Sequence, residues 1–226
     1  MKLVSTPRTE FLRDLASEIL GLYGRGRTVV AVDGTDDAAR TAFADDLAAV
    51  LIEREHPAFR ASLANFRRSR VEQERFGPES PERLFRHLYD FSLLRRVLLD
   101  PFRMGGSTGF VTRAFDPDRD TWIEPTWLTG PPDATLVIDG DYLNRSELRD
   151  LWQYSVLVET ADEAVDTLSV VPVDDAGKVH GSEDRAAEQA QADRLYRTEV
   201  RPRSRAAAVV DLTDPARPQR RFFDSC

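Results

Sequence analysis

Lysine is nearly absent from this chain of 226 residues. Of its 31 basic residues only Lys2 and Lys178 are lysines, and the others are arginines. A reaction that requires a lysine ammonium group could therefore use only one of these two residues. Acidic residues outnumber basic ones, 39 to 31, so the net charge is −8 and a nucleic-acid partner bound by bulk positive charge is not expected.

Cysteine and histidine are also scarce. Cys226 is the only cysteine, which excludes an intrachain disulfide and a cysteine-built metal site and fits a reducing cytoplasm. The three histidines are widely separated and show no metal-ligand spacing. No apolar run approaches the roughly 20 residues that span a bilayer, and the charged N-terminal segment is unlike a signal peptide. We therefore expect a soluble, cytoplasmic protein with no membrane partner.

The chain does contain a regular alternation of strand-like and helix-like segments. Apolar and β-branched runs predict strands at 28–33, 58–64, 134–140, 155–159 and 207–211. Helical spacing and capping residues predict helices at 7–20, 38–55, 80–98, 144–152, 160–168 and about 184–200. A polar, arginine-rich loop is expected at 65–78, short antiparallel pairing within 105–127, and a proline- and arginine-rich tail after 211. This order predicts a single α/β domain over 1–226, with a mostly parallel sheet and helices on both faces.

The turn after the first expected strand is the first place to look for function, because ligands of open parallel sheets bind beyond the carboxyl ends of the strands. A phosphate-binding loop has glycine, four residues, glycine, lysine and serine or threonine between a strand and a helix. The residues in that frame here are Gly34, Thr35, Asp36, Asp37, Ala38, Ala39, Arg40 and Thr41. Ala39 thus replaces the second glycine, Arg40 replaces the lysine, and Thr41 supplies the magnesium-ligand hydroxyl.

Five separated pieces of the chain match one group of enzymes in their order and spacing. They are residues 30–34, 61–67, 80–82 with 89–90, 137–140 with 148–152, and 194–215. Together they closely resemble the uridine-kinase-like group of P-loop kinases, over about residues 27–218. The resemblance implies a P-loop NTPase fold with a lid-like segment at 160–185, preceded by the helix that the residue pattern predicts within 1–26. It also implies transfer of the terminal phosphoryl group of ATP, with magnesium, to a nucleoside or similar small hydroxyl acceptor.

The resemblance assigns roles to individual residues. Residues 34–41 would hold ATP, Arg40 and Asp139 would act in catalysis, and Thr41 and Asp139 would hold magnesium. The acceptor would lie against Asn65, Phe66, Arg67 and Tyr89.

Several of these positions depart from the kinase pattern. Asp37 and Ala39 stand where glycines are expected, and Ala64-Asn65 stands where an acidic pair would supply the catalytic base. The segment 160–183, which would bring arginines over the phosphates, contains no arginine. Two hypotheses therefore stay open. One is an ATP-dependent small-molecule kinase in which Arg40 replaces the lysine, and the other is a catalytically silent relative that keeps the fold as a binding or regulatory module.

Overall fold

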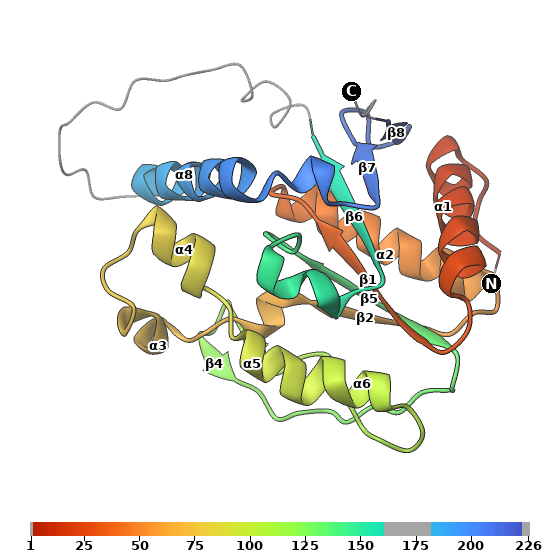
Figure 1. Cartoon of the computed structure of the whole chain (residues 1–226), viewed down its shortest axis with the longest axis horizontal. Coiled ribbons are helices and arrows are strands. Elements are labelled where there is room, and N and C mark those ends of the chain that lie inside the picture. The colour runs from red at the N-terminus through yellow and green to blue at the C-terminus, as the bar shows by residue number, and fades with distance from the viewer. Residues whose placement is uncertain (1, 161–181, 223–226) are drawn as a thin grey trace.

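The computed structural model describes residues 2–160 and 182–222, and these residues are built around a six-stranded sheet (Figure 1). In spatial order the strands are β2 (Ala58–Ser62), β5 (Ala134–Gly140), β1 (Arg27–Asp33), β6 (Tyr154–Glu159), β7 (Ala208–Asp211) and β8 (Gln219–Arg221). The pairs from β2 to β7 are parallel, and β8 adds an antiparallel edge strand. The five expected strands are confirmed, although the one expected at 58–64 ends at Ser62, and β8 lies in the expected proline- and arginine-rich tail.

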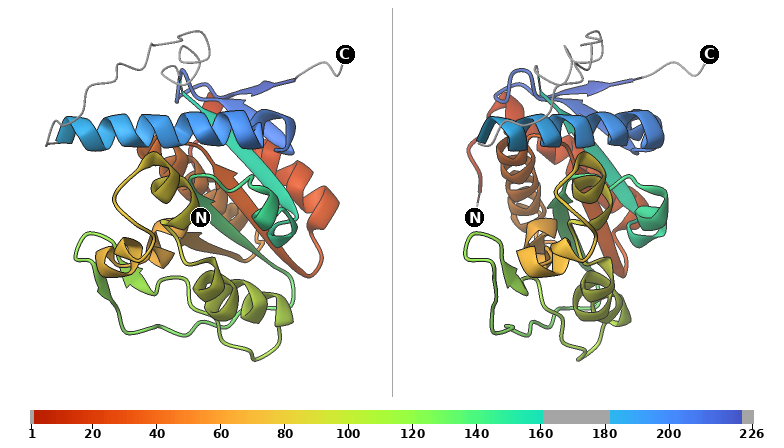
Figure 2. Two further views of the ribbon diagram at one scale, coloured as in Figure 1. Left: turned by 60° about the vertical axis from the view of Figure 1, so that its left-hand side comes forward. Right: turned by 90° about the vertical axis from the view of Figure 1, so that its left-hand side faces the viewer.

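Helices cover both faces of the sheet (Figure 2). The α-helices are α1 (Pro7–Tyr23), α2 (Asp37–Glu53), α3 (Arg70–Glu74), α4 (Pro81–His87), α5 (Phe91–Leu94), α6 (Asp100–Met104) and α8 (Ser182–Val200). Shorter turns are the 3-10 helices η1 (Leu63–Phe66), η3 (Ser146–Leu151) and η4 (Pro202–Ser204) and the π-helix η2 (Arg95–Leu99). The predicted α/β architecture is therefore confirmed.

Two hydrophobic cores lie on opposite faces of β1. Val30 and Val32 belong to the core shared with α1 and α2, and Val29 and Ala31 belong to the core shared with α4, α5, α6 and α8. Successive residues of a strand point to opposite faces, so a strand buried on both sides is mostly apolar. This explains the unbroken apolar run at 29–32, between the polar residues Thr28 and Asp33.

The expected single helix over 80–98 is wrong. Helix α4 ends at His87, and a new helix, α5, begins at Phe91. Between them the backbone of Tyr89 pairs antiparallel with that of Arg67, and the Asp90 carboxylate accepts hydrogen bonds from the N–H groups of Ser92 and Leu93. The backbone pairing and the new N-cap at Asp90 together interrupt the helix.

The expected stop at Asp100-Pro101 is also wrong, because the chain remains helical through α6. Pro101 occupies one of the first two positions of α6, directly after the wider turn of η2. The chain is helical without a break from Phe91 to Met104, so Pro101 lies inside a continuous helix. The wider turn of η2 just before it is where the helix departs from regular α-helical bonding, which accommodates a residue without an N–H.

Other expected segments differ in detail. Residues 65–78 are not all loop, because Ser69 and Glu72 form a capping box that starts α3. The helix expected at 144–152 is the 3-10 helix η3. The antiparallel pairing expected within 105–127 is confirmed in β3 (Phe115–Asp116) and β4 (Thr121–Trp122). The helix expected at 160–168 and most of the lid-like segment 160–185 lie outside the described residues.

The strand order marks one end of β1 as a site for ligands. The chain passes from β1 to β2 and β5 on one side, and then to β6 and β7 on the other. Where the direction of such an order reverses, the loops diverge and leave a crevice beyond the carboxyl ends of the strands.

Among residues 2–160 and 182–222, none of the helices is both long and apolar enough to span a bilayer.

Candidate functional site

The turn that leaves β1 is short, because α2 begins at Asp37. Asp36 caps this helix, its carboxylate accepting a hydrogen bond from the N–H of Ala39 at 2.9 Å and its carbonyl accepting one from the N–H of Arg40 at 3.0 Å. Of the eight-residue phosphate-loop frame, only Gly34, Thr35 and Asp36 therefore form the turn, and residues 37–41 lie in the first turns of α2. Two of the N–H groups that a phosphate would use are bound to the protein itself.

Gly34 has a packing role that does not depend on phosphate. A Cβ atom at this position would lie 2.7 Å from Cγ2 of Val158 and 2.8 Å from its carbonyl oxygen. Val158 belongs to β6, which pairs with β1. A glycine is therefore required here by the close approach of two neighbouring strands.

Arg40 is folded into the turn instead of extending into solvent. Its side chain is 4% exposed, and Nη1 donates to the carbonyl oxygen of Gly34 at 2.5 Å. Nη2 lies 2.7 Å from Oδ1 of Asp37, and Nε lies 3.4 Å from Oδ2 of Asp139. The guanidinium group is thus bound on three sides by this chain's own oxygen atoms.

Asp139 is completely buried near the carboxyl end of β5, and hydrogen-bond donors contact both of its carboxylate oxygens. Nη2 of Arg60 donates to its Oδ1 at 2.9 Å. Its Oδ2 accepts from the hydroxyls of Thr41, at 3.1 Å, and Ser62, at 3.3 Å, in addition to the contact with Arg40. Two guanidinium groups therefore share the charge of one buried carboxylate, and each also pairs with a second carboxylate, Arg40 with Asp37 and Arg60 with Asp45. A buried charge is stable only when it is paired in this way.

Magnesium does not fit this arrangement. The hydroxyl of Thr41 and the carboxylate of Asp139 do lie together, but a magnesium ion prefers oxygen ligands in octahedral geometry and is repelled by cations. Here it would face Arg40 and Arg60 across the same carboxylate. Within the described ranges, no group of three or more His, Cys, Asp or Glu side chains is arranged to hold a metal ion.

A second buried network lies beside the first. The hydroxyl of Tyr89 donates to Oδ1 of Asp141, and both side chains are buried. Burial raises the pKa of Asp141 and of Tyr89. Burial alone would lower the pKa of Arg40, but the carboxylates of Asp141 and Asp37 outweigh this effect and raise it, so Arg40 remains charged.

A third network connects β1 to α8. Oδ2 of Asp33 accepts from the backbone N–H of Asn144 at 3.1 Å, from its side-chain amide at 2.6 Å, and from the hydroxyl of Tyr196. Asp33 is fully buried, and burial raises its pKa although these hydrogen bonds act in the opposite direction. The carboxylate at the end of β1 is therefore used to hold α8 against the sheet.

The four residues expected to face an acceptor occupy different environments. Phe66 is completely buried in the core, and the hydroxyl of Tyr89 is bound to Asp141. The carbonyl oxygen of Asn65 accepts from the N–H of Ala114. Arg67, by contrast, lines an open cavity of about 860 Å³. Arg67 is therefore the member of this set with space for a ligand beside it.

Sequence reasoning did not identify Arg60, Ser62 or Asp141 as site residues. Arg60 and Ser62 reach Asp139 because β2 pairs with β5 in a register that sets Ser62 opposite Asp139. A charged residue within the apolar run 58–64 was the available signal for Arg60. The partner of such a residue depends on strand order, which the sequence pattern does not contain.

Comparison with known proteins identifies the fold. No protein-family model matches the sequence, and no curated protein matches it. Among solved structures, a protein described as a possible uridine kinase from Bacillus stearothermophilus aligns with a TM-score of 0.69 at 19% identity, over 89% of this chain and 96% of that one. A proposed fructose transport system kinase from Silicibacter sp. TM1040 aligns with a TM-score of 0.61 at 20% identity, over 83% and 94% of the two chains. D-glycerate 3-kinase from Cryptococcus neoformans aligns with a TM-score of 0.50 at 12% identity, over 81% and 85%. The chain therefore has the α/β fold of the P-loop kinases.

Proposed function

We propose that this protein is a catalytically silent relative of the P-loop kinases that serves as a binding module. The observation that carries the proposal is the position of the Arg40 guanidinium group, which is held by Gly34, Asp37 and Asp139 inside the turn where a kinase would bind phosphate. Arg40 and Arg60 supply the positive charge that Asp139 would otherwise receive from a metal ion.

The N-terminus of α2 is also occupied, by carboxylates of this chain. An anion binds a helix N-terminus through free N–H groups and the positive end of the helix dipole. Here the Asp36 carboxylate takes that position, and Asp37 adds a second negative charge in the first turn. Two like charges about 4 Å apart repel by roughly 4 kcal/mol at an effective dielectric of about 20, so a triphosphate is disfavoured in the same place.

The acceptor side lacks a catalytic base. The Asn65 amide cannot accept a proton from a hydroxyl at neutral pH. Asp141 is buried and already accepts a hydrogen bond from Tyr89. Within the described part of the chain, these residues provide no exposed carboxylate at the position where the kinase pattern would place the base.

One observation favours the second candidate, an ATP-dependent small-molecule kinase. The Thr41 hydroxyl and the Asp139 carboxylate remain 3.1 Å apart, as an oxygen pair for a metal would be. This function would require the Arg40 side chain to turn outward and release Asp139.

The two candidates are separated by titrating the purified protein with Mg-ATP in a calorimeter and measuring ADP release with a panel of nucleosides. The silent module is expected to give neither saturable ATP binding at the turn nor nucleoside-dependent ADP release. The Asp139→Asn variant serves as the control for contaminating ATPases. ADP release that depends on a nucleoside and is lost in Asp139→Asn would overturn the proposal.

A further inference from the structure

A polar cavity of about 860 Å³ lies beside the candidate site, between α3, the start of α4 and the turn that joins β3 to β4. These elements lie on the same side of the molecule (Figures 1 and 2). The volume is within the range of small-molecule sites, about 300–1,000 Å³. Its charged lining includes Arg67, Arg70, Arg83, Glu74, Asp118 and Asp120.

Two arginines and two carboxylates of the cavity lining are not paired with one another. The guanidinium groups of Arg67 and Arg70 make no ion pair or hydrogen bond with any of the residues that the structure describes, and neither do the carboxylates of Glu74 and Asp118. Ions of opposite sign that came within about 4 Å would form salt bridges. A ligand that carries both charges could satisfy the two sets of groups at once.

Arg83 forms a fixed part of the lining. Its side chain is 9% exposed, and Nη1 donates to the carbonyl oxygen of Gly77 at 2.7 Å. Among the residues that the structure describes, its Nε has no hydrogen-bond partner, and a carboxylate oxygen of Glu79 lies 3.9 Å from Nη2. Arg83 is therefore held in place by the protein itself, and it contributes a fixed positive charge to the lining.

We infer that this cavity binds a zwitterionic small molecule. Its anionic group, a phosphate or carboxylate, lies against Arg67 and Arg70, since planar guanidinium groups recognise these oxyanions. Its amine lies against Glu74 and Asp118. A simple anion suits the cavity less well because Glu79 also lines it, so that four acidic residues face three arginines. The inference rests on the proposed binding function and specifies its ligand class.

The test uses a series of aminoalkyl phosphates with chains of two to about six carbons, because the ligand's charge separation is unknown. Inorganic phosphate and the corresponding alkylamines are the single-charge controls. At least one member of the series is expected to bind the intact protein in calorimetry or ligand-observed NMR, at least tenfold more tightly than either control. Arg67→Gln and Asp118→Asn are each expected to weaken that binding about tenfold, the loss expected for one charge-assisted contact.

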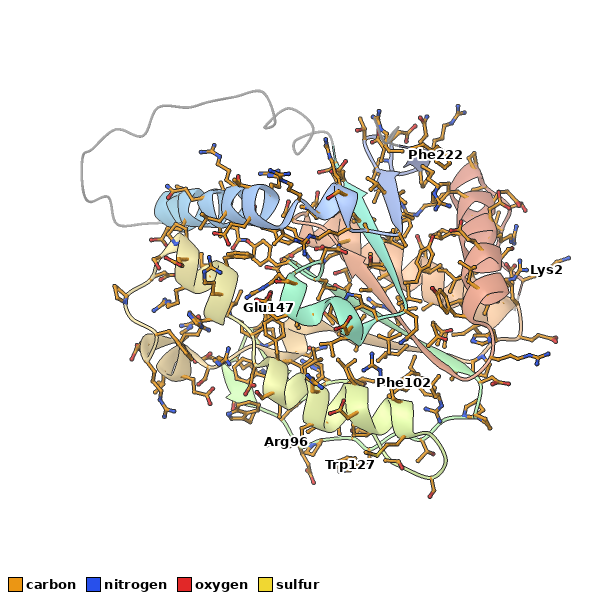
Figure 3. The ribbon with its side chains drawn as sticks, in the orientation of Figure 1. Lys2, Arg96, Phe102, Trp127, Glu147 and Phe222 are labelled. Carbon is orange, nitrogen blue, oxygen red and sulfur yellow. The ribbon has the colours of Figure 1, made fainter. Side chains whose placement is uncertain are left out.

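Arg96→Gln is the matched control, since Arg96 is an exposed arginine of η2 at the lower side of Figure 3 and does not line the cavity. This variant is expected to bind like the original protein, and thermal unfolding of every variant confirms folding. No binding by any member at millimolar concentration, equal binding of phosphate alone, or equal loss in Arg96→Gln would each overturn the inference. The binding measurements contain no ATP, so their result does not depend on kinase activity. ADP release in the kinase assay would overturn the proposed function but not the binding of a ligand in this cavity.

Discussion

Arg40 and Asp139 are 99 positions apart in the sequence, and they meet in the protein interior with Nε of Arg40 3.4 Å from Oδ2 of Asp139. The pair joins α2 to β5 at the carboxyl edge of the sheet. It lies where a kinase of this fold would be expected to hold phosphate and metal, so its strength bears on both stability and function.

Replacing Arg40 with methionine is expected to destabilise the protein by about 3 kcal/mol, because breaking a buried ion pair leaves a carboxylate with too little compensating charge. Urea unfolding measures the change. Arg86→Met is the control, since Arg86 forms partly exposed pairs with Glu82 and Glu199 and should cost under about 1 kcal/mol. Equal losses in the two variants would contradict the structural role assigned to Arg40.

The triple variant Asp37→Gly, Ala39→Gly, Arg40→Lys is expected to bind Mg-ATP measurably. Each glycine weakens the first turn of α2 by about 1 kcal/mol, which allows the segment to open, and the smaller lysine head releases Asp139. Calorimetry with Mg-ATP tests this expectation. The single variant Arg40→Lys should not bind, because the Asp37 carboxylate remains at the helix start and no added glycine loosens the first turn of α2. If the triple variant also fails to bind, these three positions are not what closes the turn.

Gly34→Ala is expected to destabilise the protein by about 2 kcal/mol or more, because its Cβ would overlap Val158 at 2.7 Å. Thermal unfolding measures the effect. Gly21→Ala is the matched control, because Gly21 lies within α1 and no atom lies within 4 Å of the added Cβ. This variant should have a free energy of unfolding about 0.5–1 kcal/mol higher than the original protein. An unchanged Tm in Gly34→Ala would show that β1 and β6 can separate there without cost.

Asp193 should make stability depend on pH. Burial raises its pKa to about 6, against hydrogen bonds from Tyr142 and Gln189 and the charge of Arg197 that lower it, while Asp141 adds to the rise. Because the folded-state pKa lies above the ordinary value of 3.8, the stabilising proton is bound at low pH and lost as pH rises through about 6. This one group should reduce the free energy of unfolding by about 1.4 kcal/mol between pH 5 and 7.5.

Asp193→Asn should remove that contribution, so the variant's unfolding free energy should fall less than the original protein's over the same pH interval. Urea unfolding at both pH values measures the difference. Asp14→Asn, at an exposed position of α1, controls for the general effect of replacing an aspartate with asparagine. Identical pH dependence in the original protein and Asp193→Asn would show that Asp193 titrates as it does in water.

Secondary structure was most predictable where burial alone decides it. Both β1 and β5 are buried on two faces, so their central residues, 29–32 and 136–138, are all apolar. The break between α4 and α5 was not predictable from helical periodicity, because it depends on the backbone pairing of Tyr89 with Arg67, more than twenty residues earlier. The start of α2 at Asp37 is decided locally by the Asp36 cap.

The sequence alone determined the α/β class, the position of the turn after β1 and the absence of a lysine from it, because strand burial and local spacing are encoded in neighbouring residues. The tertiary structure alone decided that Arg40 folds inward, that Arg60 and Ser62 reach Asp139, and that Arg67 lines a cavity. These relationships depend on strand order and register, which bring distant segments together. The side-chain direction of a long arginine then follows from the oxygen atoms that surround it.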